Sequence, residues 1–146
     1  TELFDADVYI NIPIAKHHHV TRFTGNLKNL MGAVHKSTPK RMHFPEGKTG
    51  EFIEFLDRLS QCIADINLVR MPDLSICDLT EILISNGPDG PGHIAKLQTV
   101  MAGTDALAVD VLAASLIGQD PNEVLMFGFA AEHKLGESRL EMIKVI

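Results

Sequence analysis

The sequence has few of the residues that mark a disulfide-rich, metal-thiolate or nucleic-acid-binding protein. Only two cysteines occur, without CxxC spacing, so the chain alone builds neither a four-cysteine zinc site nor an iron–sulfur cluster. Cys62 and Cys77 both fall in apolar segments, and we expect buried, reduced thiols. Tryptophan is absent, and seven phenylalanines and one tyrosine offer little surface for stacking on bases. These shortages predict that nucleic acid is not a partner.

Long hydrophobic runs are also missing. The longest apolar stretch, residues 106–117, is interrupted by Asp110 and is too short to span a bilayer. No signal peptide or lipidation motif is evident, so we expect a cytoplasmic protein with no membrane partner. A length of 146 residues with 45% hydrophobic composition fits a single domain, 1–146. Because the chain opens on Thr1 and enters an apolar strand almost directly, we interpret it as a fragment of a longer polypeptide.

Acidic residues are scarce in one part of an otherwise acidic chain. The net charge is −6, yet residues 14–48 hold seven Lys or Arg against the single acid Glu46, together with five of the seven histidines. A local basic segment in an acidic protein is typical of a site for a local anionic partner. The alternative is a solvated loop, and for residues 36–48 the two interpretations are equally favoured.

Apolar segments with strand and helix periodicity alternate along the chain. Strands are expected at 8–12, 74–77, 97–102 and 142–146, with 82–85 extending the second or forming another. Helices are expected at 23–34, 52–66 with Thr49 as cap, 106–117, and from 120 to about 132. The polar residues 35–48 predict a long loop. This alternation predicts an α/β layered domain with a mostly parallel or mixed sheet flanked by helices.

The first strand, a basic loop and the first helix together suggest a binding site. Lys16 and three consecutive histidines follow the strand, and one face of the helix holds Gly25, Lys28, Asn29 and Gly32. A glycine inside a helix costs about 1 kcal/mol relative to alanine, so two on one face suggest that something approaches closely. Close helix packing would also explain them.

The Lys16–His19 loop, Asp78 and the Gly103–Asp105 turn all follow predicted strands, where α/β proteins bind ligands. A separate glycine- and proline-rich loop, NGPDGPG, occupies residues 86–92. Pro88 and Pro91 remove amide donors, so the loop is a poor phosphate cradle. Asp110 is the only charge in its apolar helix and is expected to be buried with a polar partner. Asp110 then either forms a salt bridge or caps a neighbouring loop. The alternative is that it lies opposite Lys16 or Lys28 at the site.

Six short motifs in order resemble the domain-of-unknown-function 362 family. They are INIPIAKHH, LKNLMG, NGP, AGTDALAVD, LIGQDP and AAEHKLG. The sequence departs from the family pattern at two points. Ala106 stands where proline is usual, and the expected histidine, His18, is flanked by His17 and His19. The residues matching the pattern are Lys16, His18, Lys28, Asn29, Gly32, Pro88, Asp105 and Asp110.

The resemblance implies an uncharacterised bacterial or archaeal protein, often joined to a ferredoxin-like segment that binds four-iron clusters. A ferredoxin-like segment or protein is therefore an expected partner, although this chain ligates no such cluster itself. No reaction or cofactor follows from the family name.

The sequence therefore supports a small anionic ligand in a redox-linked protein as the first hypothesis. Lys16, Lys28, Asn29, Gly32 and Pro88 are its predicted ligand-binding residues. His18, Asp105 and Asp110 are its predicted catalytic residues, with His18 suited to proton transfer near neutral pH. A histidine-based metal module and a structural domain without a site are the alternatives. We rank metal lower, because the surrounding bases would repel a cation.

Overall fold

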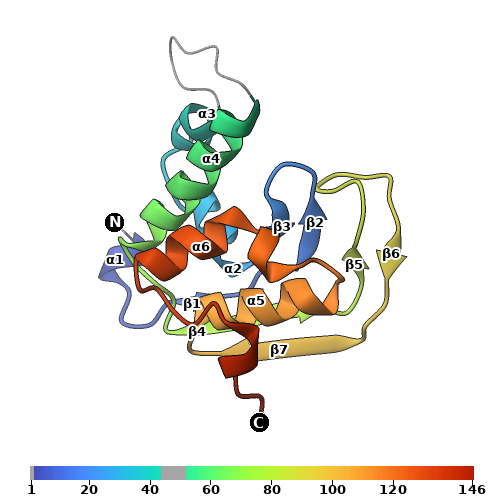
Figure 1. Cartoon of the computed structure of the whole chain (residues 1–146). Helices are drawn as coiled ribbons and strands as arrows, with labels where there is room; N and C mark the ends of the chain where they lie inside the picture. The colour runs from blue at the N-terminus through green and yellow to red at the C-terminus, as the bar shows by residue number, and fades with distance from the viewer. Residues whose placement is uncertain (1, 44–51) are drawn as a thin grey trace.

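A three-stranded mixed sheet supports the helices. The structure is a computed structural model, and it describes residues 2–43 and 52–146. Strands β1 (Ile10–Asn11), β4 (Leu74–Leu79) and β7 (Thr99–Gly103) lie in the order β1-β4-β7 (Figure 1). β1 runs parallel to β4, whereas β7 runs antiparallel to it with Ala102 opposite Ile76. The predicted α/β fold with a mixed sheet is confirmed.

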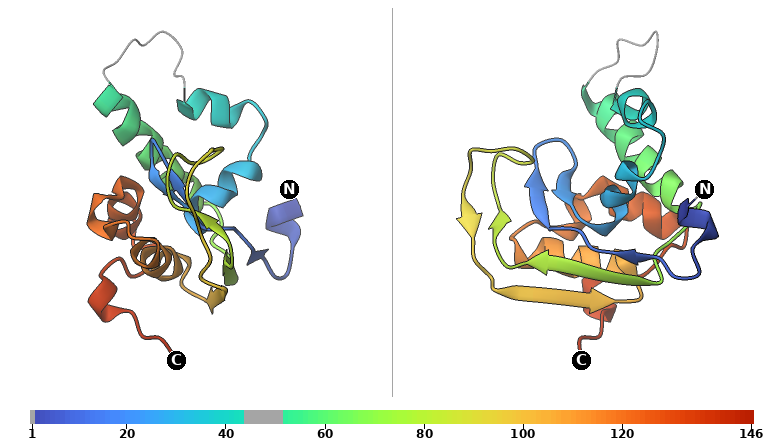
Figure 2. Two further views of the ribbon diagram at one scale, coloured as in Figure 1. Left: turned by 90° about the vertical axis from the view of Figure 1, so that its right-hand side faces the viewer. Right: turned by 180° about the vertical axis from the view of Figure 1, so that it is seen from behind.

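The larger helices gather on one side of this sheet. Helix α5 (Ala106–Leu116) contacts β4 and β7, while α2 (Asn26–Asn29) packs on α5, and α4 (Phe52–Asn67) packs on α6 (Leu125–Glu132). The two views of Figure 2 show these helices on the same side. The core lies between them and the sheet, and its largest fully buried side chains include Phe23, Phe127, Leu27, Leu59 and Ile63.

The first predicted helix starts later than its periodicity suggested. Residues 16–24 instead form an antiparallel hairpin of β2 (Lys16–His18) and β3 (Arg22–Thr24), and Phe23 enters the core from a strand. Arg22 at the hairpin turn has a φ of 61°, which ends helical geometry there. α2 therefore begins at Asn26, and it continues into the 3-10 turn η1 (Leu30–Gly32).

Two other segments also differ from expectation. Part of the predicted loop forms α3 (Thr38–His43), where Pro39 occupies the first turn and so removes no hydrogen bond. Residues 44–48 and the predicted cap Thr49 lie outside the described residues. The predicted strand at 142–146 is wrong, because the 3-10 turn η3 (Leu140–Met142) occupies its start and no strand follows.

The remaining elements agree closely with the sequence pattern. The helix predicted at 52–66 is α4, and the helix predicted at 106–117 is the buried α5. Asp120 caps a 3-10 turn, η2 (Pro121–Glu123), before α6 begins. The segment at 82–85 gives β5 (Ile82–Leu83), which pairs with β6 (Ile94–Ala95) and does not extend β4. The short α1 (Glu2–Asp5) precedes β1.

Candidate functional site

Strand β2 lies against the glycine- and proline-rich loop at 86–92. The backbone amide of Gly87 donates to Nδ1 of His17 at 3.1 Å, and the Gly87 carbonyl accepts from the His19 amide at 3.0 Å. Nζ of Lys16 donates to the carbonyl oxygen of Pro88 at 3.5 Å. A Cβ on Gly87 would collide with the backbone carbonyl of His17, so only glycine permits this approach. The structure thus brings together Lys16 and Pro88, two predicted ligand-binding residues.

Lys28 joins the same region from the first turn of α2. Its Nζ donates to Oγ1 of Thr21 at 3.2 Å, and that hydroxyl in turn donates to the Phe23 carbonyl at 3.0 Å. Burial, and then the charge of Lys16, lower the pKa of Lys28 from 10.5 to about 7. Within residues 2–43 and 52–146, neither lysine forms an ion pair with a carboxylate. The two lysines therefore lie close enough to interact, and neither is paired with an acid in the part of the chain that the structure describes.

His18 is the buried histidine of this cluster. Its Nδ1 accepts from the backbone amides of Val20 and Thr21 at 3.1 and 3.2 Å, which places the ring proton on Nε2. Its ring stacks on His19 with 5.1 Å between centroids. Burial, and then the charge of Lys28, lower the pKa of His18 to about 3. At neutral pH His18 is thus an uncharged hydrogen-bond donor through Nε2. We refer below to Lys16, Lys28 and the uncharged His18 between them in sequence as the cationic cluster, after its two lysines.

Asn29 takes part in a separate amide network. Its Nδ2 donates to Oδ1 of Asn11 at 2.7 Å, and Nδ2 of Asn11 donates to the Asn26 backbone carbonyl at 3.0 Å. Asn11 and Asn26 are both buried. The network ties β1 to the start of α2, and so it fixes the helix that carries Lys28. Neither Asn11 nor Asn26 was among the predicted site residues, although Asn11 lies inside the INIP motif.

Asp110 is completely buried, as predicted, and its partners belong to the N-terminus of α2. One carboxylate oxygen accepts from the Asn26 backbone amide at 2.7 Å, and the other accepts from the Leu27 amide at 2.9 Å. Burial raises the pKa of Asp110 to about 6, and the bonds from Leu27 and Asn26 oppose that rise. The capping alternative therefore applies, because no described lysine is bonded to this carboxylate.

Asp105 is likewise engaged at a helix start. One oxygen accepts from the Ala108 amide at 2.9 Å and caps α5, and the other accepts from the Glu137 amide at 2.9 Å. A Cβ on Gly136 would collide with this carboxylate, so glycine there allows the C-terminal segment to approach. Asp105 therefore links α5 to the residues after α6. Neither of its bonds reaches the cationic cluster.

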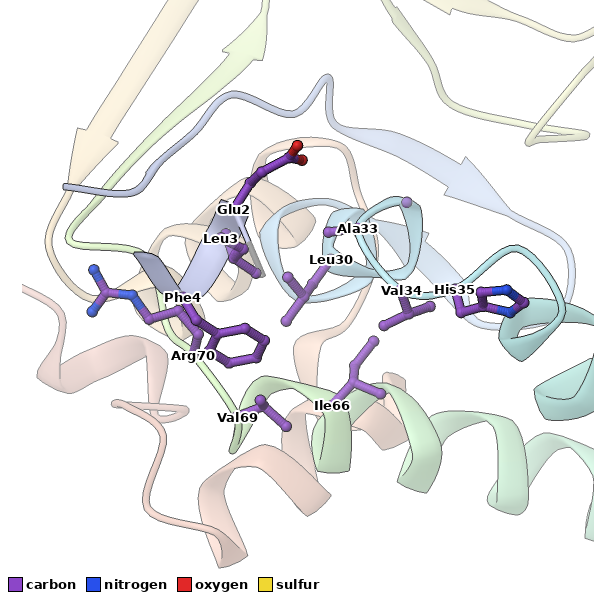
Figure 3. A pocket seen from close by; sticks show the side chains of 11 residues that line it. Glu2, Leu3, Phe4, Leu30, Ala33, Val34, His35, Ile66, Val69 and Arg70 are labelled. Atoms are coloured by element: carbon purple, nitrogen blue, oxygen red, sulfur yellow. The ribbon is translucent and has the colours of Figure 1, made fainter. Parts of the chain in front are cut away.

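Gly32 lines a cleft of mixed polar and apolar character away from the cationic cluster. The cleft has a volume of about 570 Å³ and lies between α1, η1 and the end of α4. Figure 3 shows its apolar side chains, among them Phe4, Leu30, Val34, Ile66 and Val69. A Cβ on Gly32 would meet no atom within 4 Å, whereas a Cβ on Gly25 would collide with Asp110. The two glycines of the predicted helix face therefore have different surroundings, and only Gly25 is needed for packing.

The described residues contain no group of three or more His, Cys, Asp or Glu side chains that could hold a metal ion. The three consecutive histidines have other partners, since His17 and His19 bond to Gly87 and His18 bonds to the backbone of its own turn. Cys62 and Cys77 are free thiols, and burial raises the pKa of Cys77 to about 12. No helix in the described part of the chain combines the length and hydropathy needed to cross a membrane.

The fold and these motifs define an uncharacterised α/β domain, and comparison with known families agrees. The chain belongs to the family described as Domain of unknown function (DUF362), whose model matches residues 1–115. It is 32% identical over 136 residues to the thylakoid-associated protein sll1697 of Synechocystis sp. (strain ATCC 27184 / PCC 6803 / Kazusa). That match covers 92% of this chain but 39% of the relative, so the chain spans well under half of the relative's length. No solved structure matches the chain.

Proposed function

We propose that this domain binds a small anionic ligand at the cationic cluster of Lys16, His18 and Lys28, beside the carbonyl of Pro88. The observation that carries the proposal is the pair of lysines that have no carboxylate partner among residues 2–43 and 52–146. Burial, and then repulsion by Lys16, lower the pKa of Lys28 to about 7. A bound anion would remove this repulsion, and charge-assisted hydrogen bonds to an anion are about twice as strong as neutral ones.

Each member of the cluster has a distinct role in this proposal. Lys16 and Lys28 supply charge, and the Nε2–H of His18 supplies a neutral donor whose direction is fixed by the bonds at Nδ1. A histidine with a pKa of about 3 is suited to hydrogen bonding more than to proton transfer at neutral pH. If the site also catalyses a reaction, we assign to His18 a hydrogen bond to the ligand and not the transfer of a proton.

In this proposal the other predicted site residues do not contact the ligand, and some of them hold the surrounding helices in place. Asp110 and Asn29 hold α2, which carries Lys28, and Asp105 holds the start of α5. Gly32 lines the cleft beside α1 and is assigned no ligand contact.

We further infer that the domain works in a redox-linked, cytoplasmic protein with a ferredoxin-like segment or partner, and that it binds no nucleic acid. Family resemblance supports the redox link, and the scarcity of aromatic residues supports the proposal that nucleic acid is not a partner. The Synechocystis relative is described as thylakoid-associated, and for this chain we keep the proposal of a cytoplasmic protein without a membrane partner.

The test is a titration of the purified chain with sulfate, phosphate and a small dicarboxylate, followed by thermal unfolding. Chloride at matched ionic strength separates specific binding from screening. We expect saturable stabilisation by at least one anion, because a ligand of the folded state raises the melting temperature. Lys28→Ala and Lys16→Ala should each abolish it, whereas the exposed Lys36→Ala should not. Equal stabilisation of all four proteins would refute the site.

A further inference from the structure

The sheet has a second face that the described helices do not cover. In the first strand and its continuation, the inward residues Asn11, Pro13 and Ala15 are buried. The alternate residues are β-branched aliphatics with large exposed fractions: Ile10 at 47%, Ile12 at 65% and Ile14 at 56%. The outward row of this strand is thus more apolar than its inward row. A strand that faces water normally shows the reverse pattern.

The other two strands extend the same apolar surface. Leu74 lies opposite Ile10, and Ala102 lies opposite Ile76, so their side chains share one face of the sheet by register. Val100 is 57% exposed and pairs with Asp78, the only charged residue of this row. We call this surface the outer sheet face, and its apolar residues are Ile10, Ile12, Ile14, Leu74, Ile76, Val100 and Ala102.

Such a surface is unusual for a parallel strand pair. Parallel strands are joined by crossovers and are normally covered on both faces, and exposed contiguous apolar patches of this kind mark interaction surfaces. Figure 2 shows α2, α4, α5 and α6 on one side of the sheet, with only the short α1 near the edge of the other. Covering the face would contribute about 25 cal/mol for each Å² of apolar surface removed from water.

We propose that a helical layer from a further segment of the same polypeptide covers the outer sheet face. The length of the Synechocystis relative supports this occupant, since the matched region is 39% of that protein and the rest suffices for another layer. The composition of the face specifies the chemistry of the layer. It must present aliphatic side chains without charge, except near Asp78, where a basic or polar group fits.

The proposal is tested by the accessibility of a cysteine placed on the outer sheet face. The substitution Ile12→Cys is made in the 146-residue chain and in the complete polypeptide that the source cells make. Leu68→Cys is the control in both proteins. Leu68 is 55% exposed, directly follows the end of α4 and belongs to no strand of the sheet. Both proteins are treated with a maleimide, and labelled peptides are quantified by mass spectrometry so that Cys62 and Cys77 are counted separately. Val100→Cys replaces Ile12→Cys if that variant does not fold.

We expect both cysteines to be labelled in the 146-residue chain. In the polypeptide purified from cells, Ile12→Cys should lose most of its labelling until the protein is denatured, and Leu68→Cys should keep it. Equal labelling in the two proteins, or a cell-made polypeptide no longer than this chain, would overturn the proposal. So would protection that accompanies dimerisation of the 146-residue chain, which indicates a second copy. If Ile12→Cys is protected in the cell extract but is labelled once the polypeptide has been purified, a separate protein covers the face. That result also overturns the proposal.

Discussion

Asp110 accepts hydrogen bonds from both the backbone amide and the side-chain amide of Asn26, at 2.7 and 2.9 Å, across 84 residues of sequence. With the bond from the Leu27 amide, the only charge of α5 caps the start of α2. A negative charge at a helix N-terminus is favourable because the unpaired amides there carry partial positive charge. The buried carboxylate therefore determines where α2, and with it Lys28, lies in the fold.

Replacing Asp110 by Asn tests this role. Asn keeps the shape but turns an amide group toward at least one donor, so a buried N–H of α2 loses its acceptor. Because losing a bond to a buried charged group leaves a donor unsatisfied, we expect a loss of about 2–3 kcal/mol in the free energy of unfolding. Urea denaturation measures it. The matched control is Asp120→Asn at the exposed cap of η2, which should cost less than about 1 kcal/mol. Equal, small losses in both variants would contradict the capping role.

The glycines of the predicted helix face give a second prediction. Gly25→Ala places a Cβ against Asp110 and Phe23, so we expect overpacking to cost about 1–3 kcal/mol. Gly32→Ala places its Cβ in open space, and we expect a change within about 0.5 kcal/mol. Thermal unfolding of the two variants side by side measures the difference. A large loss for Gly32→Ala alone would mean that the surroundings of the two glycines are misassigned.

Much of the fold follows from local patterns in the sequence. The period of 3.6 in α4 and the apolar composition of α5 specify those helices, because each must bury a long apolar surface. Phe23 shows where local patterns fail, since its spacing to Leu27 suits a helix while the hairpin turn at Arg22 determines the real structure. The direction of β7 was equally hidden, because strand pairing depends on contacts distant in sequence.

The candidate site was predictable only in part. Lys16, His18, Lys28 and Pro88 do come together, and the basic clustering of the sequence indicated three of them. Thr21 and Asn26 were missed, because a single Thr or Asn gives no pattern until its partner is known. Asn29 shares the motif LKNLMG with Lys28, and Asp105 belongs to the motif AGTDALAVD, but both are bonded away from the cluster.

The tautomer and titration of His18 provide a third prediction. The folded-state pKa of His18 is about 3 against 6.5 in the unfolded chain, so the unfolded state binds more protons between these values. Stability should therefore fall as pH decreases through 6.5 and level off near 3, by at most about 5 kcal/mol from this residue. His18→Asn keeps an acceptor near Nδ1 but cannot titrate, and it should reduce this acid sensitivity, whereas the exposed His35→Asn should not. Nitrogen NMR should show the His18 proton on Nε2, and a proton on Nδ1 would contradict the assignment.

The last prediction concerns the charge of Lys28 in protein without added anions. The pKa of Lys28 is about 7 in the folded state and 10.5 in the unfolded chain, so folding opposes its protonation. The resulting penalty is absent above pH 10.5, grows as pH falls, and is complete below pH 7. It is at most about 5 kcal/mol, since each unit of pKa corresponds to about 1.4 kcal/mol. Lys28→Met keeps the apolar stem and removes the charge, so it should raise the free energy of unfolding at pH 6.5 and lose most of that advantage by pH 10. The exposed Lys36→Met should change stability little at either pH. Denaturation at the two pH values, in chloride buffers, measures the difference, and a Lys28→Met variant less stable than the parent at pH 6.5 would show that the lysine already has a compensating partner.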